Sequence, residues 1–522
     1  MRKLLSTLRD SITGWLDGFD RLAFVGHLMP LMMPGAADDF FDGRKILRCK
    51  ATAWMQKQTT SLETSVAEQV EAATGHPITY LRSTKDSKED AARCRQHELG
   101  ITNGLIGAWS CVEPCRSIRM VGGAGAPTLI PIQTQCKHLY VYQIHPLWGF
   151  MHTRIQTWFP YRIQVVINGR EWLSRQLDEA GISYERSGNK FITIADDARA
   201  RQLQDQQVAT PWWTELNKLL PVAFPTMEQT VGPHLGYTWI NWQSEWATDL
   251  LFNDAATLAD VSQRMMQYAF ATGDSAKLIR FFNRPGMIGK SGAIRNSATP
   301  KLQTKMKEYP DGMRLRHWFN GNSIKMYTEF NVLRFETTIN QPDDFRVYRH
   351  KQAADKQGPK ELLPLRKGVA DMAPRAEISR RINSAYMDHV AAANDDENKL
   401  HDILAPYLST RTKQGHRIRA LNPFGKDRTL LTLIADPQFL ISGCSNKELR
   451  DRLKNDPRYQ GRTEKQLSGI ITRAIRLLRD HGILHKIPSR RRYRVSPDGR
   501  RLVNVLTAAL SASTKELAKQ AA

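Results

Sequence analysis

The feature that most constrains the fold is a pair of helix-start signals near the end of the chain. Ser445 and Glu448 stand three residues apart, as do Thr463 and Gln466, and both pairs have the capping-box pattern. After the second pair, apolar residues recur at three- and four-residue spacing through 467–480 and must face a core. The sequence therefore predicts two short helices in succession, of which the second is strongly amphipathic.

A short, basic hairpin is expected after these helices. Ile483–Ile487 and Arg492–Val495 have strand character and are joined by Pro488–Arg491, and Ser496–Gly499 turns into a last helix. Arginine suits phosphate because its guanidinium donates in a planar fork. The basic residues that we expect to contact nucleic acid here are Arg473, Arg476, Arg479, Lys486, Arg490, Arg491, Arg492 and Arg494.

This order of elements over 426–514 resembles the winged helix-turn-helix family found in many bacterial transcription regulators. The residues that carry the resemblance are Ser445–Leu453, Thr463–Asp480 and the wing Leu484–Val495. The resemblance implies that 467–480 lies in the major groove and that the wing reaches the backbone or the minor groove. Contact with a protein partner stays open, because some winged helices bind proteins.

The charge balance also indicates a polyanion as partner. The chain has 75 Lys and Arg against 52 Asp and Glu, a net charge of +23 at neutral pH. Such an excess favours phosphate binding, because each neutralised phosphate releases condensed counterions. We therefore expect nucleic acid, DNA more than RNA, although a membrane-surface binder would share part of this bias.

Other features predict a cytoplasmic protein. Six cysteines in 522 residues do not form the dense disulfide framework of a secreted scaffold. Residues 1–20 have the apolar spacing of a helix rather than the core of a signal peptide, and the apolar patch Ala23–Met33 is too short to cross a bilayer. We expect no membrane partner, and association into an oligomer stays open.

A chain of this length exceeds what one hydrophobic core usually organises, so we expect an α+β multidomain protein. An N-terminal mixed sheet with helices should be followed by a helical middle, a β-rich piece and the C-terminal winged helix. The expected boundaries are an α+β domain at 1–195 with a hairpin at 138–159, a helical region plus β-sheet 313–338 within 196–348, a linker with helices at 349–425, the winged helix at 426–514 and a tail at 515–522.

Two groups of acidic residues are candidate catalytic residues. Glu245 and Asp249 share a face at helical spacing, with Asp254 nearby, and such a pair can hold a divalent ion such as Mg²⁺ for phosphodiester cleavage. Glu336 is the third candidate, on a predicted strand that also carries Arg334. Surface carboxylates at this spacing also occur without any function.

The predicted sheet at 313–338 places charged residues on one face. Lys325 shares a strand face with Tyr327, as Arg334 does with Glu336, so this face is either solvent-exposed or a polyanion-binding and catalytic floor. Ser-Ile-Lys-Met-Tyr followed by Leu-Arg-Phe-Glu resembles the core strands of phage and plasmid rolling-circle replication proteins. Those proteins add a His-hydrophobic-His metal motif, which this chain does not contain.

Two further sets of residues could bind a ligand. Cys111, Cys115, Cys136 and His138 offer three thiolates and an imidazole that zinc accepts, or they are core residues. The hairpin at 138–159 mixes aromatic and basic residues that can stack single-stranded bases, with the backbone contacts expected from Arg154 and Arg162.

Two principal functions follow from these patterns, and a third stays open. The first is a nucleic-acid-binding protein of DNA or structured RNA that uses the winged helix and is linked to a mobile element or defence system. The second is a divalent-metal-dependent nuclease or a replication or recombination enzyme. A role as the protein partner of a noncoding RNA is the third.

The body of the chain resembles bacterial proteins to which no activity is attached. The stretches Trp109–Cys115, Arg154–Gly169 and Ser244–Asp249 carry this resemblance. It therefore implies no function.

Overall fold

The structure is a computed structural model of the 522-residue chain. It describes residues 2–82, 86–122, 128–272, 278–279, 302–309, 312–351, 359–391, 400–413, 415–436, 439, 443–454, 456–488 and 490–511. The tail predicted at 515–522 lies outside these residues.

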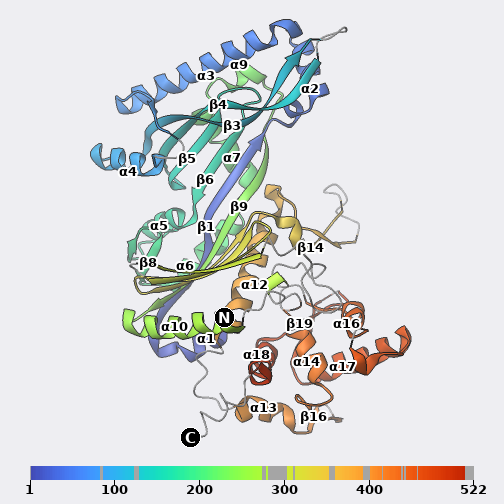
Figure 1. Ribbon diagram of the computed structural model, residues 1–522. Coiled ribbons are helices and arrows are strands. Elements are labelled where there is room, and N and C mark those ends of the chain that lie inside the picture. The colour runs from blue at the N-terminus through green and yellow to red at the C-terminus, as the bar shows by residue number, and fades with distance from the viewer. Residues whose placement is uncertain are drawn as a thin grey trace.

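One twisted, eleven-stranded sheet runs through most of the molecule (Figure 1). Its order is β10-β11-β12-β13-β9-β1-β6-β5-β4-β3-β2, and it is mixed because β2 runs parallel to β3 while the other neighbours are antiparallel. The strands are β1 (Ile12–His27), β2 (Thr79–Tyr80), β3 (Gly104–Val121), β4 (Thr128–His145), β5 (Gly149–Gln156), β6 (Ile163–Asn168), β9 (Thr238–Phe252), β10 (Leu302–Tyr309), β11 (Gly312–Phe319), β12 (Asn322–Glu329) and β13 (Val332–Ile339).

The sheet repeats one topology on either side of its centre. The long strands β1 and β9 pair with each other there. In one half, β1 also pairs with β6, the last strand of the meander β3–β6. In the other half, β9 pairs with β13, the last strand of the meander β10–β13. The three predicted strands of the β-rich piece are confirmed as neighbours β11, β12 and β13.

Helices cover one face of this sheet. Helices α2 and α3 pack on β4 and β3, and α10 and α12 pack on the β9–β13 side. These and the remaining helices that precede the C-terminal elements are α1 (Arg2–Thr7), α2 (Pro34–Gly43), α3 (Ala51–Thr74), α4 (Lys88–Glu98), α5 (Gly169–Glu179), α6 (Asp197–Val208), α7 (Trp212–Asn217), α8 (Leu220–Ala223), α9 (Met227–Val231), α10 (Ala255–Thr272), α12 (Met372–Val390) and α13 (Leu400–Leu408). None of the described helices is long and apolar enough to span a bilayer.

The opposite face carries the side chains of Glu245 and Glu336, and we call it the site face. Two elements cover it locally. Helix α4 lies over the half of the sheet formed by β3–β6, where the Lys88 ammonium is 5.0 Å from the ring centroid of Tyr140 in β4. The hairpin of β7 (Tyr184–Ser187) and β8 (Lys190–Ile194) reaches the centre, where Asn189 donates a hydrogen bond to Asp20 (3.2 Å).

Two segments differ from the sequence prediction. Apolar spacing predicts a helix over 1–20, but only Arg2–Thr7 is helical and β1 begins at Ile12. Helical spacing likewise predicts a helix around Glu245, which lies on strand β9. The reason is that β1 and β9 pair along their whole lengths although they are far apart in the sequence, and such pairing overrides local spacing.

Helix α12 is part of the main core, although it falls in the stretch predicted as a linker with helices. Its Asn383 accepts a hydrogen bond from Thr337 (2.7 Å) and donates one to Thr248 (3.0 Å), so it is tied to β13 and β9. Buried polar groups need such partners. The helix therefore positions the two strands that carry Glu245 and Glu336.

The last elements follow the predicted order. They are α14 (Arg428–Ile434), α16 (Asn446–Leu453), α17 (Glu464–Asp480), the hairpin of β18 (Leu484–Lys486) and β19 (Tyr493–Val495), and α18 (Pro497–Ser511). Both capping boxes are present, at Ser445 with Glu448 and at Thr463 with Gln466. These helices share one buried apolar cluster with the nearby sheet, since Ile471 belongs to the same cluster as Phe335.

Candidate functional site

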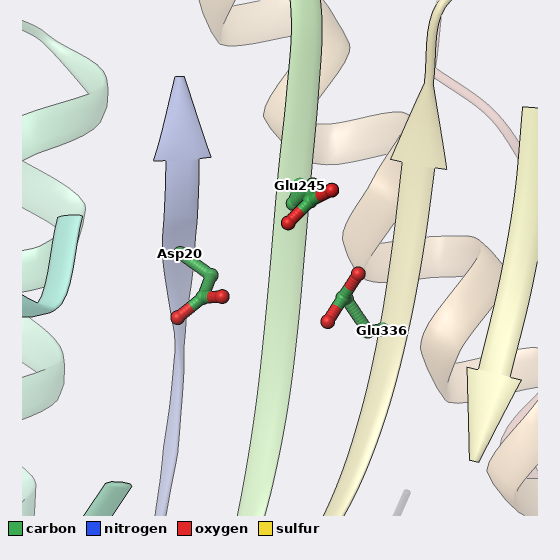
Figure 2. Close-up of side chains that lie close together, drawn as sticks. All are labelled: Asp20, Glu245 and Glu336. Carbon is green, nitrogen blue, oxygen red and sulfur yellow. The ribbon is translucent and has the colours of Figure 1, made fainter. Parts of the chain in front are cut away.

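Three carboxylates from three adjacent strands meet on the site face. Asp20 lies on β1, Glu245 on β9 and Glu336 on β13, and one oxygen of each lies within 4.8 Å of the others (Figure 2). Among the described residues this is the one group of three or more His, Cys, Asp or Glu side chains that meets this distance. The group has the spacing of ligands around a single cation.

The strand register explains how the three meet. Glu245 lies opposite Thr338, so Glu336 is its diagonal neighbour two residues along β13. The pairing of β1 with β9 shifts between Phe19 and Arg21, which leaves Asp20 as an extra residue. Phe19 packs against Trp246 on the opposite face, so alternation turns Asp20 toward Glu245, and the bulge keeps Arg21 on that face as well.

The three carboxylates are largely removed from water, with side-chain exposures of 8% for Asp20, 15% for Glu245 and 2% for Glu336. Burial raises the pKa of Glu245 to about 7, and the neighbouring Glu336 carboxylate adds to the rise, while Lys325 opposes it. Glu245 therefore changes its protonation state close to neutral pH.

Lys325 of β12 is the nearest cation to this group. Its ammonium contacts Glu336 and lies 4.0 Å from a Glu245 oxygen. Tyr327 donates a hydrogen bond to the other oxygen of Glu336 (3.0 Å). Lys325 was predicted as a nucleic-acid contact, and its side chain is 12% exposed at the edge of the site.

A second charged cluster adjoins the first. Arg334 donates to Asp249 (2.8 Å) and to Asp20 (2.9 Å), and Arg170 at the start of α5 lies 2.8 Å from the same Asp249. Together with Glu245 and Glu336 the buried network holds four carboxylates against three cations, Arg170, Arg334 and Lys325. A fourth buried cation, Lys190, acts on Asp20 and Asp249 as well and lies 2.9 Å from Glu329.

Asp249 was predicted as catalytic, and the structure places it in a buried ion pair with Arg334 and Arg170. Burial tends to raise its pKa, but the guanidinium groups of Arg334 and Arg170 hold the pKa below its usual value. Both of its oxygens are used by these arginines. Arg334 was predicted as a nucleic-acid contact, and it is fully buried in the same network. Both side chains are therefore engaged by this ion-pair network.

The nearby Asp254 is also separate from the site, because it accepts hydrogen bonds from Thr257 at the start of α10.

Sequence reasoning missed Asp20. The signal that could have found it is an acidic residue inside a run that is otherwise apolar, Gly-Phe-Asp-Arg-Leu-Ala-Phe. A buried charge in a strand needs a partner or a function. The prediction of a helix over 1–20 hid this signal, because it placed Asp20 at an exposed helix end.

A pocket of about 400 Å³ opens beside the carboxylates. Asp20 and Glu245 line it, together with Arg93 of α4, His152 of β5 and Asn189 of the β7–β8 turn. Burial and the charges of Arg21 and Arg154 lower the pKa of His152 to about 3, so this imidazole is neutral at physiological pH. The pocket therefore exposes Asp20 and Glu245, but not Glu336, along its wall.

The predicted cysteine and histidine set comes to one face of β3 and β4. Cys111 lies directly opposite His138, and Cys136 Sγ lies 3.9 Å from His138 Nδ1. Within the described residues, however, no three of the ligand atoms of Cys111, Cys115, Cys136 and His138 lie within 4.8 Å of one another. Burial raises the pKa of Cys111 to about 12, as expected of a core thiol. Zinc binding here stays a prediction.

The two basic residues predicted on the 138–159 hairpin and its neighbour have partners in the structure. Arg154 forms an ion pair with Glu113 and donates to Gln164 (3.2 Å). Arg162 lies 6.0 Å from the ring of Trp242, and burial lowers its pKa. Neither contact excludes a phosphate, but Arg154 is mainly a partner of Glu113.

The C-terminal basic residues divide into outward and inward groups. Arg492 is a correction, because it is 6% exposed, lies 2.9 Å from Glu448 and donates to the Gly443 carbonyl (2.7 Å). Arg490 stacks 3.4 Å from the ring centroid of Tyr348 in β14 (Arg346–Arg349), and burial lowers the pKa of Arg494. The residues that remain exposed are Arg473, Arg476, Arg479, Lys486 and Arg491.

The exposed side of α17 borders a groove of about 530 Å³. Arg473 and Arg476 line one side of it, and Arg417 of β17 (His416–Ile418) and Lys426 line another. Asp427 is neutralised by Arg419 at 2.6 Å. The groove therefore presents a net positive surface.

No protein-family model, curated protein or solved structure matches this chain.

Proposed function

We propose that this protein binds nucleic acid and that Asp20, Glu245 and Glu336 hold a divalent cation, Mg²⁺ above all, for phosphodiester hydrolysis. The observation that carries the proposal is the convergence of these three carboxylates beside a pocket, on the face of the sheet that also carries basic and aromatic side chains. Carboxylate oxygens are the ligands that Mg²⁺ prefers.

The protonation behaviour of Glu245 supports a cation. Burial, with the neighbouring Glu336 carboxylate, raises the pKa of Glu245 to about 7 although Lys325 opposes the rise. A divalent ion would satisfy all three carboxylates and would compete with the proton on Glu245. Lys325 supplies positive charge when the ion is absent, and its flexible side chain can turn to a bound phosphate instead.

The chemistry needs few groups. A bound divalent ion would stabilise charge on the phosphoryl oxygens and lower the pKa of a bound water. Hydrolysis then forms a bond from the water oxygen to phosphorus and breaks the bond to the leaving ester oxygen. The proton of that water would pass to solvent and the leaving oxygen would take one up from solvent, since Glu245 is itself proposed as a ligand of the ion.

The test is cleavage of end-labelled oligonucleotides, DNA and RNA, with Mg²⁺ or Mn²⁺ and with EDTA. We expect cation-dependent cleavage that Glu245→Gln and Glu336→Gln each reduce at least about 100-fold, since each removes a ligand charge. Glu71→Gln on the exposed surface of α3 is the matched control. Full activity in either site variant would remove that carboxylate from the proposal.

A second function is favoured by the outward face of α17. We propose that the C-terminal elements form a winged helix that binds DNA through Arg473, Arg476 and Arg479, of which Arg476 has a side-chain exposure of 76%. The order of the helices and the exposed arginines support this proposal. The wing contributes less to DNA contact, because its Arg490 is stacked on Tyr348. The helix would then be the main contact, with Arg491 and Lys486 as the remaining wing contacts.

A further inference from the structure

A row of cations leads across the site face to the carboxylates. Lys305 of β10 lies directly opposite Arg316 of β11, Arg316 lies opposite Lys325 of β12, and Lys325 lies opposite Glu336 of β13. Neighbouring strands are about 4.8 Å apart, so the three cations follow one another at close spacing. We call Lys305, Arg316 and Lys325 the basic row.

Aromatic rings hold the arginines of this surface in place. The Arg316 guanidinium lies 4.0 Å from the ring centroid of Trp318, and the Arg314 guanidinium lies 4.7 Å from those of both Tyr309 and Tyr327. A guanidinium stacked on a ring keeps its donors available at the edge of its plane. The Nε groups of Arg314 and Arg316 have no hydrogen-bond partner among the described residues.

The outer part of this surface is open to solvent, while its inner end is recessed. Lys305 is exposed and Tyr309 is 39% exposed, whereas Glu336 is 2% exposed. Helix α4 and the β7–β8 turn border the pocket at the recessed end. A ligand must therefore lie flat on β10–β12 and bend down to reach the carboxylates.

From this geometry we infer that the nucleic acid bound on the site face is single-stranded, with its backbone along the basic row and one phosphodiester at the pocket. Duplex DNA bends little over the width of a few strands, because its persistence length is about 50 nm. A duplex also cannot enter a pocket of about 400 Å³. A single strand can bend, and its free bases can stack on exposed aromatic rings such as Tyr309. The inference rests on the proposed function, both for nucleic acid as the ligand and for the reaction at the recessed end.

The test compares binding of the full chain to a labelled single strand and to a duplex of the same sequence, by fluorescence anisotropy in EDTA. We expect Lys305→Ala/Arg316→Ala to weaken single-strand binding at least about 10-fold and to leave duplex binding unchanged. The slope of log affinity against log salt should fall by about 1.4, since two phosphate contacts are lost. Lys50→Ala/Lys57→Ala, which removes two exposed lysines near and on α3, is the matched control.

Lys305→Glu guards against a loss caused by misfolding, because this residue is exposed on the edge strand β10. It should weaken single-strand binding while leaving the unfolding transition unchanged. Unchanged single-strand affinity in both basic-row variants would overturn the inference, as would loss of duplex affinity alone.

The two proposals fail in different ways. Cation-dependent cleavage that is confined to duplex and insensitive to Lys305 would leave the proposed function standing and remove the single-strand inference. Single-strand binding that depends on the basic row, without cleavage in the presence of any cation, would support the single-strand inference and remove the proposed hydrolysis. A combined readout of anisotropy and cleavage on the same oligonucleotides separates these results.

Discussion

Arg334 and Asp249 form a buried, bidentate ion pair between β13 and β9, with both side chains 1% exposed. Glu245 lies on the same face of β9 as Asp249, with only Ala247 between them on that face. The pKa of Glu245 is raised, whereas that of Asp249 is lowered. The same strand face thus holds one carboxylate that is fully neutralised and one that is not. The difference separates a structural acid from a candidate functional one.

The first prediction concerns stability. Asp249→Asn should lower the free energy of unfolding by about 3–5 kcal/mol, because it leaves Arg334 and Arg170 buried without their shared partner. Glu245→Gln should change it by less than about 1 kcal/mol or raise it, because it removes an incompletely neutralised charge. Denaturant unfolding at neutral pH measures both. Equal losses in the two variants would mean that Glu245 is structural as well.

The second prediction concerns pH. Burial raises the pKa of Glu245 from 4.5 to about 7, so between these values the folded state keeps a proton that the unfolded state has released. This group therefore makes the free energy of unfolding fall as pH rises from about 4.5 to about 7, by an amount on the order of 2–3 kcal/mol. Mg²⁺ or Mn²⁺ affinity should rise over the upper part of that range, because the cation competes with the proton.

Thermal unfolding with and without the cation, from pH 5 to pH 8, measures this dependence. Glu245→Gln should flatten both curves, whereas Glu71→Gln should leave them unchanged. A cation effect of equal size at pH 5 and pH 8 would speak against Glu245 as a ligand.

The third prediction concerns the C-terminal arginines. Arg473→Ala/Arg476→Ala/Arg479→Ala should weaken duplex DNA binding and reduce the salt slope by about 2–3, since three phosphate contacts are lost, without loss of stability. Arg492→Ala should instead lower stability by about 2 kcal/mol, because it removes charged hydrogen bonds to Glu448 and Gly443. Electrophoretic mobility shifts over a salt series, paired with unfolding curves, distinguish the two. An unchanged slope in the α17 variant would exclude this helix from the interface.

The fourth prediction concerns the start of α5, which carries Arg170 into the buried network. A Cβ at Gly169 would lie 1.9 Å from the Phe19 carbonyl oxygen, which is backbone and cannot easily move. Gly169→Ala should therefore destabilise the fold by about 2–4 kcal/mol. Gly35→Ala in α2, where a Cβ meets nothing within 4 Å, should be neutral or slightly stabilising. Calorimetric or chemical unfolding of both variants measures the difference.

Local signals in the sequence predicted local structure correctly. The capping boxes at Ser445 and Thr463 appear as hydrogen-bonded helix starts. Alternation along 313–338 likewise predicted three neighbouring strands, with Lys325 and Tyr327 on one face of their strand and Arg334 and Glu336 on one face of the next. These features depend on residues only a few positions apart, and the sequence alone was enough to determine them.

The partners of charged residues could not be predicted in the same way. Arg334 and Arg492 appeared equivalent to exposed cations in the sequence, and each is buried against a carboxylate from a distant segment. Asp20 joined the site through the pairing of β1 with β9, which no sequence pattern marked. Only the pairing of β1 with β9 and β13 decided which acids are neutralised and which remain available, because electrostatic energy depends on distances in space and on removal from water.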